Sequence, residues 1–352
     1  MKKNHSIQQM YTSFDETPLE NIVRLLKSHQ LEFLSGQEMS QILGLSRVAI
    51  WKNIKKLQNL GYKIQSKRNL GYRLTNKTNL LLPWEITQSL QTEFLGSKIY
   101  YFKTISSTQD FALTLTSKRH ENGSLIIAQK QTRGRGRLNR RWFSPTGGIW
   151  LSILLKPNFE VNQVSLFPMM TSLALAIAIE KVLNLKPELK WPNDVMFNNK
   201  KVAGILVDAS MESNQIDYIV IGVGINFKIK PSILAKRINR KDNAVTTLVN
   251  RNKNTDPILF LQAFLFELEK LYNKLMTHDT NEIKREWEKR SSTLGKNVTI
   301  STPSGQVKGK AIRLDEEGAL LVSKKGKIQR LLVGDVSYHN HDTSKSRIRL
   351  RK

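Results

Sequence analysis

Residues 131–148 read QTRGRGRLNRRWFSPTGG and directly follow a predicted strand at 125–130, whose first four residues are apolar. Glycine and arginine alternate at 134–137, so the backbone can bend closely around a ligand while guanidinium groups offer bidentate contacts to a phosphate. An isolated GRGR run is more often a solvated basic loop or an RNA-binding tract. The position after a strand, with Trp142 following, favours a structured anion site. The ending of a Walker loop is absent, so ordinary nucleotide triphosphatase chemistry is not indicated.

The sequence around this loop predicts a large sheet covered by helices. Strands rich in Ile, Val and Leu are expected at 125–130, 149–155, 202–208 and 217–225. The segment 169–183 is an almost wholly apolar helix, which must be buried on both sides and therefore packs against the sheet. Residues 228–256 are basic and rich in Asn, without clean periodicity, and are expected to form loop. An amphipathic helical segment covers about 257–290.

The sequence before this region predicts a winged helix-turn-helix. Apolar spacing marks a first helix from Leu19, and a second short helix is expected over 37–43. A third helix begins after Ser46, a plausible N-cap, and stops at Gly61. Alternating apolar residues at 62–74, interrupted by a basic, Gly-containing stretch, then indicate a β-hairpin.

The C-terminal part predicts a small β-barrel-like module and a tail. Short strand signals lie at 298–300, 307–314 and 319–322, separated by Pro and Gly residues. The last stretch, 345–352, carries five basic residues and no acidic ones. We expect it to be a mobile tail.

Composition excludes several classes of protein. Lys and Arg total 56 against 29 Asp and Glu, a net charge of +27 that attracts polyanions without proving nucleic-acid binding. There is no cysteine, which excludes disulfides, a thiol nucleophile and Cys-ligated metal sites, and the six His residues show no metal-like spacing. The apolar stretch 169–179 is about half of the roughly 20 residues that a membrane span requires. The polar start does not resemble a signal peptide, so we expect a soluble, cytoplasmic protein.

Five segments in a fixed order resemble the motifs of biotin protein ligases. Residues 134–142, the Gly-Arg loop, resemble their GRGRxGRxW pattern, with Asn139 in place of a Gly. The segment 106–110 resembles their S-T-N motif, with Gln109 in place of Asn. KWPND at 190–194, KVAGIL at 201–206 and GVGIN at 222–226 match closely. The resemblance covers about 98–227, and 294–337 resembles the SH3-like C-terminal module of the family.

The resemblance implies an α+β protein with three domains. These are a winged helix-turn-helix DNA-binding domain at 1–78, a biotin- and ATP-binding catalytic domain at 79–290 and an SH3-like β-barrel at 291–338, followed by the basic tail at 339–352. The catalytic domain is expected to contain a class II synthetase-like mixed sheet with helices.

The resemblance also assigns site residues, one by one. Biotin is expected to contact Ser107, Thr108, Gln109, Gln131, Arg135, Gly136, Arg137 and Lys201. ATP is expected to contact Gly134, Arg135, Arg137, Trp142, Asn193, Lys201 and Asn226. The expected catalytic residues are Lys201, Arg135, Arg137 and Asp194, without a metal held by protein ligands. Simpler alternatives stay open: a helix N-cap at Ser107 and Thr108, plain packing for Trp142, a strand-edge charge for Lys201 and a turn cap for Asp194.

The implied chemistry has two steps. A carboxylate is a poor electrophile, so biotin and ATP, with Mg²⁺ accompanying the nucleotide, first form biotinyl-5′-AMP. Fixed cations offset the repulsion between the carboxylate and the α-phosphate. A lysine of a biotin carboxyl carrier protein then attacks as a free amine. With a pKa near ~10.4 only about one such side chain in 10³ is neutral at physiological pH, and desolvation beside cations lowers that cost.

A repressor function requires that the winged helix bind operator DNA. The expected contacts are Ser46, Arg47, Lys52, Lys55 and Lys56 on the third helix, with Lys67 and Arg68 in the wing. A ligand-promoted homodimer would present two such helices. The competing hypotheses are a lipoate or octanoate ligase, a transcription factor without ligase activity, and a ligase whose helix-turn-helix does not bind DNA.

Overall fold

The computed structural model describes residues 16–29, 32–76, 78–117, 121–157, 163–212, 215–235, 245–249 and 255–338. The chain divides into two compact units. The first runs to Ser89 and includes Asp256–Ile258; the second contains Leu90–Thr255 and the chain from Leu259 onward. The predicted tail at 339–352 and parts of the 228–256 segment lie outside the described residues.

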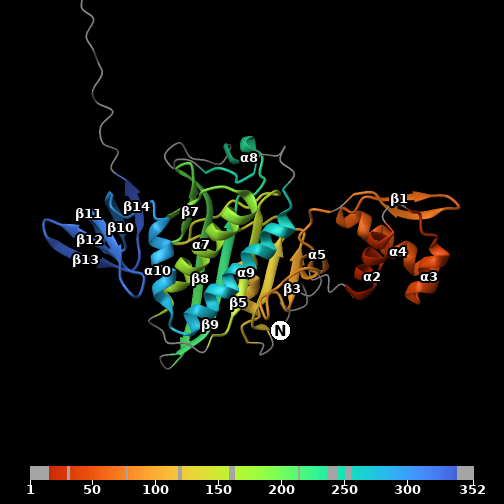
Figure 1. Cartoon of the computed structure of the whole chain (residues 1–352), viewed down its shortest axis with the longest axis horizontal. Helices are drawn as coiled ribbons and strands as arrows, with labels where there is room; N and C mark the ends of the chain where they lie inside the picture. Colours follow the sequence, from red (N-terminus) through yellow and green to blue (C-terminus); the bar gives the residue numbers. More distant parts are fainter. Residues whose placement is uncertain are drawn as a thin grey trace, which may run out of the picture. The chain divides into compact units, whose positions relative to one another are not determined.

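The first unit contains the predicted winged helix-turn-helix. Helices α2 (Glu16–Ser28), α3 (Gly36–Leu43) and α4 (Arg47–Leu60) are followed by the antiparallel hairpin of β1 (Ile64–Lys67) and β2 (Gly71–Leu74) (Figure 1). Helix α4 begins where expected, because the Ser46 hydroxyl accepts a hydrogen bond from Ala49 N at 3.1 Å. It ends at Gly61, whose φ of 108° suits a residue without a Cβ.

A short helix, α5 (Pro83–Thr87), belongs to the same unit. Trp84 Nε1 donates to the Tyr62 hydroxyl at 2.6 Å, and that hydroxyl donates to Glu85 Oε1 at 2.5 Å. Lys27 Nζ lies 2.7 Å from the other Glu85 oxygen. These buried contacts fasten α5 to α2 and to the chain that follows α4.

The second unit is built on a mixed seven-stranded sheet. The strand order is β3-β4-β5-β9-β8-β7-β6, in which only the β3–β4 pair is parallel. The strands are β3 (Ile99–Phe102), β4 (Ser124–Ala128), β5 (Ile149–Leu155), β6 (Glu188–Lys190), β7 (Asp194–Phe197), β8 (Lys200–Glu212) and β9 (Gln215–Ile225). All the predicted strands are present, and β8 and β9 form a long hairpin through the centre.

The predicted apolar helix packs on this sheet. Helix α7 (Leu166–Ala178) continues into a π-helical turn at Ile179–Leu183, and it contacts β6, β7 and β8. By length and composition Leu166–Leu183 would suffice to cross a membrane, but 67% of this segment is buried inside the protein. The helix is therefore part of the core, as its composition predicted.

One expectation about helices was wrong, and another is confirmed in more detail. The 228–256 segment contains a short helix, α8 (Pro231–Ala235), which is too brief to show periodicity. The amphipathic segment is two helices, α9 (Pro257–Met276) and α10 (Thr280–Lys289), because the chain turns at His278 with a φ of 60°. Both pack on α7: the Phe167 and Tyr272 rings lie 6.4 Å apart, and Trp287 Nε1 donates to Ser172 Oγ.

The C-terminal module is a five-stranded antiparallel sheet of order β13-β12-β11-β10-β14. Its strands are β10 (Asn297–Thr302), β11 (Gly305–Leu314), β12 (Leu320–Lys324), β13 (Lys327–Leu331) and β14 (Asp335–Tyr338). Trp191 Nε1 donates to Gly318 O, and Ser165 Oγ donates to Glu317 O. These contacts tie the module to the rest of the second unit and bring the start of β14 to the functional site.

Candidate functional site

A cavity of about 390 Å³ lies between the Gly-Arg loop and the β5, β8 and β9 strands of the central sheet. Predicted residues in its wall are Thr108, Gln109, Gln131, Arg135, Gly136, Arg137, Trp142, Asn193, Asp194, Lys201 and Asn226. Motif residues that are distant in sequence therefore meet in one cavity. Ser107 and Gly134 are not in the wall.

Three glycines leave space for side chains that line the cavity. A Cβ on Gly224 would lie 2.4 Å from Trp142 Nε1, and one on Gly204 would lie 3.0 Å from the same ring. A Cβ on Gly222 would lie 2.5 Å from Gln109 Oε1. The glycines of the AGIL and GVGIN segments are thus required by close packing on the sheet.

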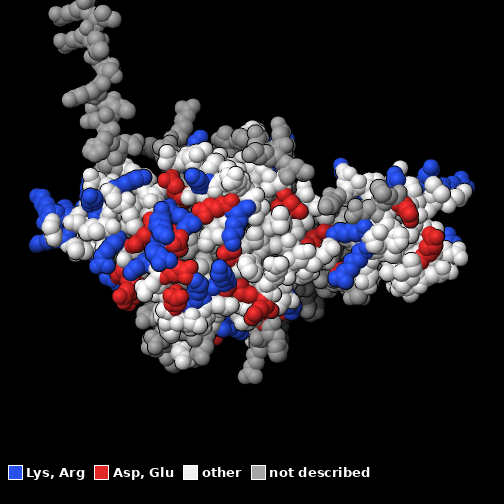
Figure 2. Space-filling view, in the orientation of Figure 1, with Lys and Arg blue, Asp and Glu red and all other residues white. Residues whose placement is uncertain are grey.

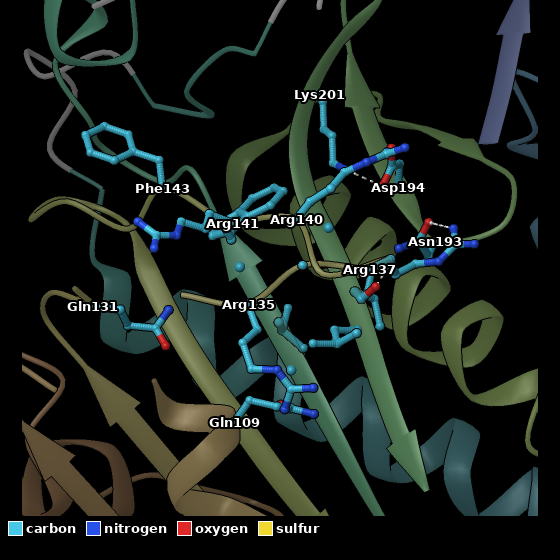
Figure 3. A pocket seen from close by; sticks show the side chains of 18 of the residues that line it. Gln109, Gln131, Arg135, Arg137, Arg140, Arg141, Phe143, Asn193, Asp194 and Lys201 are labelled. Carbon is cyan, nitrogen blue, oxygen red and sulfur yellow. Dashed lines mark hydrogen bonds and ion pairs between the residues drawn. The ribbon is translucent and has the colours of Figure 1, made fainter. Parts of the chain in front are cut away.

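Gln109 and Gln131 are part of an amide and hydroxyl network at one end of the cavity (Figure 3). Gln131 Oε1 accepts from Thr108 N at 2.8 Å, and Gln131 Nε2 donates to Ser144 Oγ. Gln109 Nε2 donates to Val220 O at 2.9 Å, and Ser152 Oγ donates to Gln109 Oε1. Both amides are therefore held in fixed orientations, which suits recognition of a polar ring.

The two predicted residues outside the wall support the structure around it. Ser107 is fully buried and caps α6 (Thr108–Thr114), since its hydroxyl accepts from Asp110 N at 3.2 Å. Gly134 allows a close approach, because a Cβ there would lie 2.5 Å from Trp142 O. The helix-cap alternative thus describes Ser107 in this structure.

Arg135 lies beside Gln109 at the same end (Figure 3). Its Nη1 is 3.1 Å from Asp110 Oδ1 and 2.9 Å from Asp208 Oδ2. Gln109 Nε2 also donates to Asp208, at 3.2 Å. The guanidinium is thus balanced by two carboxylates, and the motifs gave no signal for Asp208 because it lies beyond the AGIL segment on β8.

The opposite end of the cavity contains Lys201, Asp194, Arg137 and Asn193 (Figure 3). Lys201 Nζ lies 2.5 Å from Asp194 Oδ1 and 5.0 Å from the centre of the Trp142 ring. Arg137 Nη1 donates to Asn193 Oδ1 at 2.8 Å. Burial lowers the pKa of Arg137, while Asp335 and Asp194 act in the other direction, and an arginine stays protonated in either case.

The C-terminal module contributes Asp335 to the wall. Asp335 Oδ2 accepts from Arg140 Nη2 at 2.5 Å, and Asp335 Oδ1 lies 3.9 Å from Arg137 Nη1. Asp335 was not predicted, because strand order alone does not reveal which end of a small β module meets a distant loop.

Two buried donors in the cavity have no hydrogen-bond partner among the described residues: Trp142 Nε1 and Asn226 Nδ2. Asn226 is 2% exposed. Since buried polar groups are almost always paired, these donors indicate a site for a ligand that carries acceptors. Such a ligand would lie between a fixed amide network and a cluster of cations.

Comparisons with known proteins agree with this geometry. The model of the biotin/lipoate A/B protein ligase family matches residues 101–226. The model of an HTH domain matches 18–73, and that of the biotin protein ligase C-terminal domain matches 293–338. The chain is 34% identical over 318 residues to the bifunctional ligase/repressor BirA of Bacillus subtilis (strain 168), covering 90% of this chain and 97% of that protein. It belongs to the biotin protein ligase family.

Other members of the family show the same likeness. The chain is 29% identical over 318 residues to the bifunctional ligase/repressor BirA of Escherichia coli (strain K12), covering 87% of this chain and 93% of that protein. The solved biotin protein ligase of Aquifex aeolicus, in complex with biotin and ATP, superposes with a TM-score of 0.56 at 29% identity, covering 68% of this chain and 98% of that one.

This biotin protein ligase family member also has a basic surface on its winged helix. Arg47, Lys52, Lys55 and Lys56 are exposed on α4, and Lys67 and Arg68 are exposed at the tip of the hairpin. Figure 2 shows basic side chains gathered at this tip, whereas acidic and basic side chains intermix over the second unit. The Ser46 hydroxyl caps α4 and already accepts a hydrogen bond from Ala49 N.

Within the parts of the chain that the structure describes, no three His, Asp or Glu side chains are arranged to hold a metal ion.

Proposed function

We propose that this protein activates biotin with ATP to form biotinyl-5′-AMP and transfers the biotin to a lysine of a biotin carboxyl carrier protein. The observation that carries the proposal is the cavity, in which a fixed amide network at one end faces Lys201, Arg137 and two unpaired buried donors at the other. The names of the relatives and the biotin and ATP of the Aquifex structure support it.

In the first step the biotin carboxylate attacks the α-phosphorus of ATP, and pyrophosphate leaves with Mg²⁺. Two anions must approach, so we infer that Lys201 and Arg137 reduce the repulsion where negative charge develops. Arg135 lies at the other end of the cavity, paired with Asp110 and Asp208, and there it would contact biotin. Asp194 lies 2.5 Å from Lys201 Nζ, which supports a role in positioning this ammonium. Trp142 and Asn226 would contact the nucleotide through the donors that now lack partners.

The polar network would bind the head of biotin. Thr108, Gln109 and Gln131 have their amide and hydroxyl groups oriented by the protein before any ligand arrives. A preorganised site of this kind discriminates strongly against ligands that cannot return its hydrogen bonds. We therefore favour biotin over lipoate or octanoate as the acid.

In the second step the carrier lysine attacks the acyl carbon of the adenylate, the bond to the AMP oxygen breaks, and AMP leaves. The amine must lose its proton before attack. We propose that desolvation beside Lys201 and Arg137 favours the neutral amine, because two fixed cations oppose a third.

The test is biotinylation of a purified carrier domain. Incubation with biotin, ATP and Mg²⁺ should add one biotin to the domain, seen as a mass increase that is lost when its acceptor lysine is replaced by arginine. A carrier of unchanged mass after incubation with a folded enzyme would refute the ligase function.

We further propose that the protein is a biotin-responsive repressor, in which residues 1–78 bind operator DNA, 79–290 catalyse and 291–338 complete the site. The winged helix and the repressor names of the relatives support this. The adenylate would favour a homodimer, because ordering of the 134–142 loop completes a self-complementary surface, and a dimer reads two half-sites. A cytoplasmic location follows from both activities.

The repressor function is tested by titrating DNA from the organism's biotin-gene promoters at fixed salt, with and without biotin plus ATP. The adenylate should raise the affinity by roughly 5- to 150-fold, the usual size of such coupling. Deletion of 1–89 should abolish DNA binding while adenylate formation continues. Equal affinity with and without the adenylate would refute ligand-controlled repression.

A further inference from the structure

Helix α4 exposes two large apolar side chains, Val48 and Trp51. Val48 is 62% exposed and Trp51 is 51% exposed. The core side of the same helix is fully covered, because Ile50, Ile54 and Leu57 have no exposed surface. The winged helix therefore has its complete core without Val48 and Trp51.

The two side chains lie near the N-terminus of α4, at the second and fifth residues of the helix. Residues three apart lie on one side of a helix, so Val48 and Trp51 share a face, and Lys52 and Lys55 continue that face toward the C-terminus. Arg47 precedes the pair. An apolar pair surrounded by exposed cations fits a partner that has negative charge at the edges of a groove and apolar groups inside the groove.

Duplex DNA has this pattern in its major groove. Its phosphates line the edges, and thymine presents a methyl group in the groove that apolar side chains contact. In a helix-turn-helix the N-terminal residues of the recognition helix reach the base edges, which is the position of Val48 and Trp51 in α4. Cations on the same face can contact phosphates, which fix the register without reading sequence.

We propose that Trp51, with Val48 beside it, reads thymine methyl groups and sets the base preference of this protein. The proposal rests on the proposed DNA binding and goes beyond it. Lys52, Lys55 and the wing would supply affinity for any duplex, whereas the apolar pair would supply preference among duplexes.

The experiment uses the full chain with biotin, ATP and Mg²⁺. A duplex is first selected from a randomised pool with the unaltered protein, and affinities for this duplex and for a scrambled one are then measured over a range of salt. Trp51→Ala should lower the ratio of the two affinities by roughly 5-fold or more, the usual cost of one lost base contact. The slope of log affinity against log salt concentration should not change, because Trp51→Ala removes no phosphate contact.

Two matched variants separate this effect from its alternatives. Lys55→Ala, on the same face, should lower the affinity for both duplexes equally. It should also reduce the steepness of log affinity against log salt concentration by about 0.9, as expected for the loss of one phosphate contact. Ile42→Ala removes a 59% exposed apolar side chain from α3 and should leave the ratio unchanged.

Replacing thymine by uracil removes the methyl group alone. Uracil is placed at the base position where Trp51→Ala loses its preference. It should lower the affinity of the unaltered protein as much as Trp51→Ala does, and it should not lower the affinity of Trp51→Ala further. Equal loss on both duplexes for Trp51→Ala, or additive effects of uracil and the substitution, would overturn the proposal. An unaltered protein that selects no duplex would instead refute the DNA-binding function itself.

Discussion

The indole of Trp142 lies directly over Gly224, and a Cβ at this glycine would come within 2.4 Å of Trp142 Nε1. The glycine therefore determines how deeply the ring enters the cavity. Gly224→Ala should displace the indole and speed release of biotinyl-5′-AMP by roughly 5- to 150-fold, since overpacking usually costs about 1–3 kcal/mol. The measurement is the dissociation rate of the adenylate.

A double-variant cycle identifies the cause of this effect. If the new methyl group acts through the ring, Gly224→Ala should have a much smaller effect in a Trp142→Ala background. An equal loss in both backgrounds would mean that Gly224 acts without Trp142.

Lys201 is held 2.5 Å from Asp194, at the end of the cavity assigned to the phosphate. Lys201→Ala should slow adenylate formation by on the order of 10²-fold, because it removes a fixed cation from the place where charge develops. The adjacent Lys200 is exposed and is not in the cavity wall, so Lys200→Ala is the matched control. A near-normal rate for a folded Lys201→Ala would leave Lys201 as a strand-edge charge.

The winged helix could be predicted almost residue by residue, because its signals are local. Ser46 and Gly61 define the ends of α4 through their own backbone and side-chain chemistry. The cavity wall was predicted only where the motifs lie. Ser152 on β5 and Asp335 on β14 in the wall, and Asp208 on β8 behind Arg135, depend on strand register and on packing between distant segments, which no local pattern encodes.

Asp335 connects the C-terminal module to the Gly-Arg loop through Arg140, at 2.5 Å. This ion pair is half-exposed, so we expect it to be worth only about 0.2–1 kcal/mol. Asp335→Ala should therefore speed tryptic cleavage of the ligand-free loop by roughly 1.5- to 5-fold. Glu317→Ala, which removes a carboxylate that contacts Arg330 in the same module, is the control. Identical cleavage of all three proteins would show that Asp335 does not restrain the loop.

Glu286 on α10 makes stability depend on pH. Hydrogen bonds from Lys289 and then Arg290 lower the pKa of its carboxyl from 4.5 to about 2. A lowered pKa in the folded state adds stability above pH 4.5, and this contribution is lost as the pH falls from 4.5 toward about 2.

Glu286→Gln should accordingly reduce the fall in Tm between about pH 7 and about pH 3. The exposed Glu316→Gln is the charge-matched control. An unchanged pH dependence in Glu286→Gln would show that these contacts do not persist in solution.

Activation of biotin by the cavity is tested most directly by formation of the adenylate. The purified protein is incubated with ATP, Mg²⁺ and either biotin or lipoate, and the bound adenylate is identified by mass. The fixed amides of Gln109 and Gln131 predict that biotinyl-5′-AMP accumulates and that lipoyl-AMP forms far more slowly, since a dithiolane leaves buried polar groups unpaired. Equal rates with the two acids, or no adenylate with biotin, would show that the cavity does not select and activate biotin.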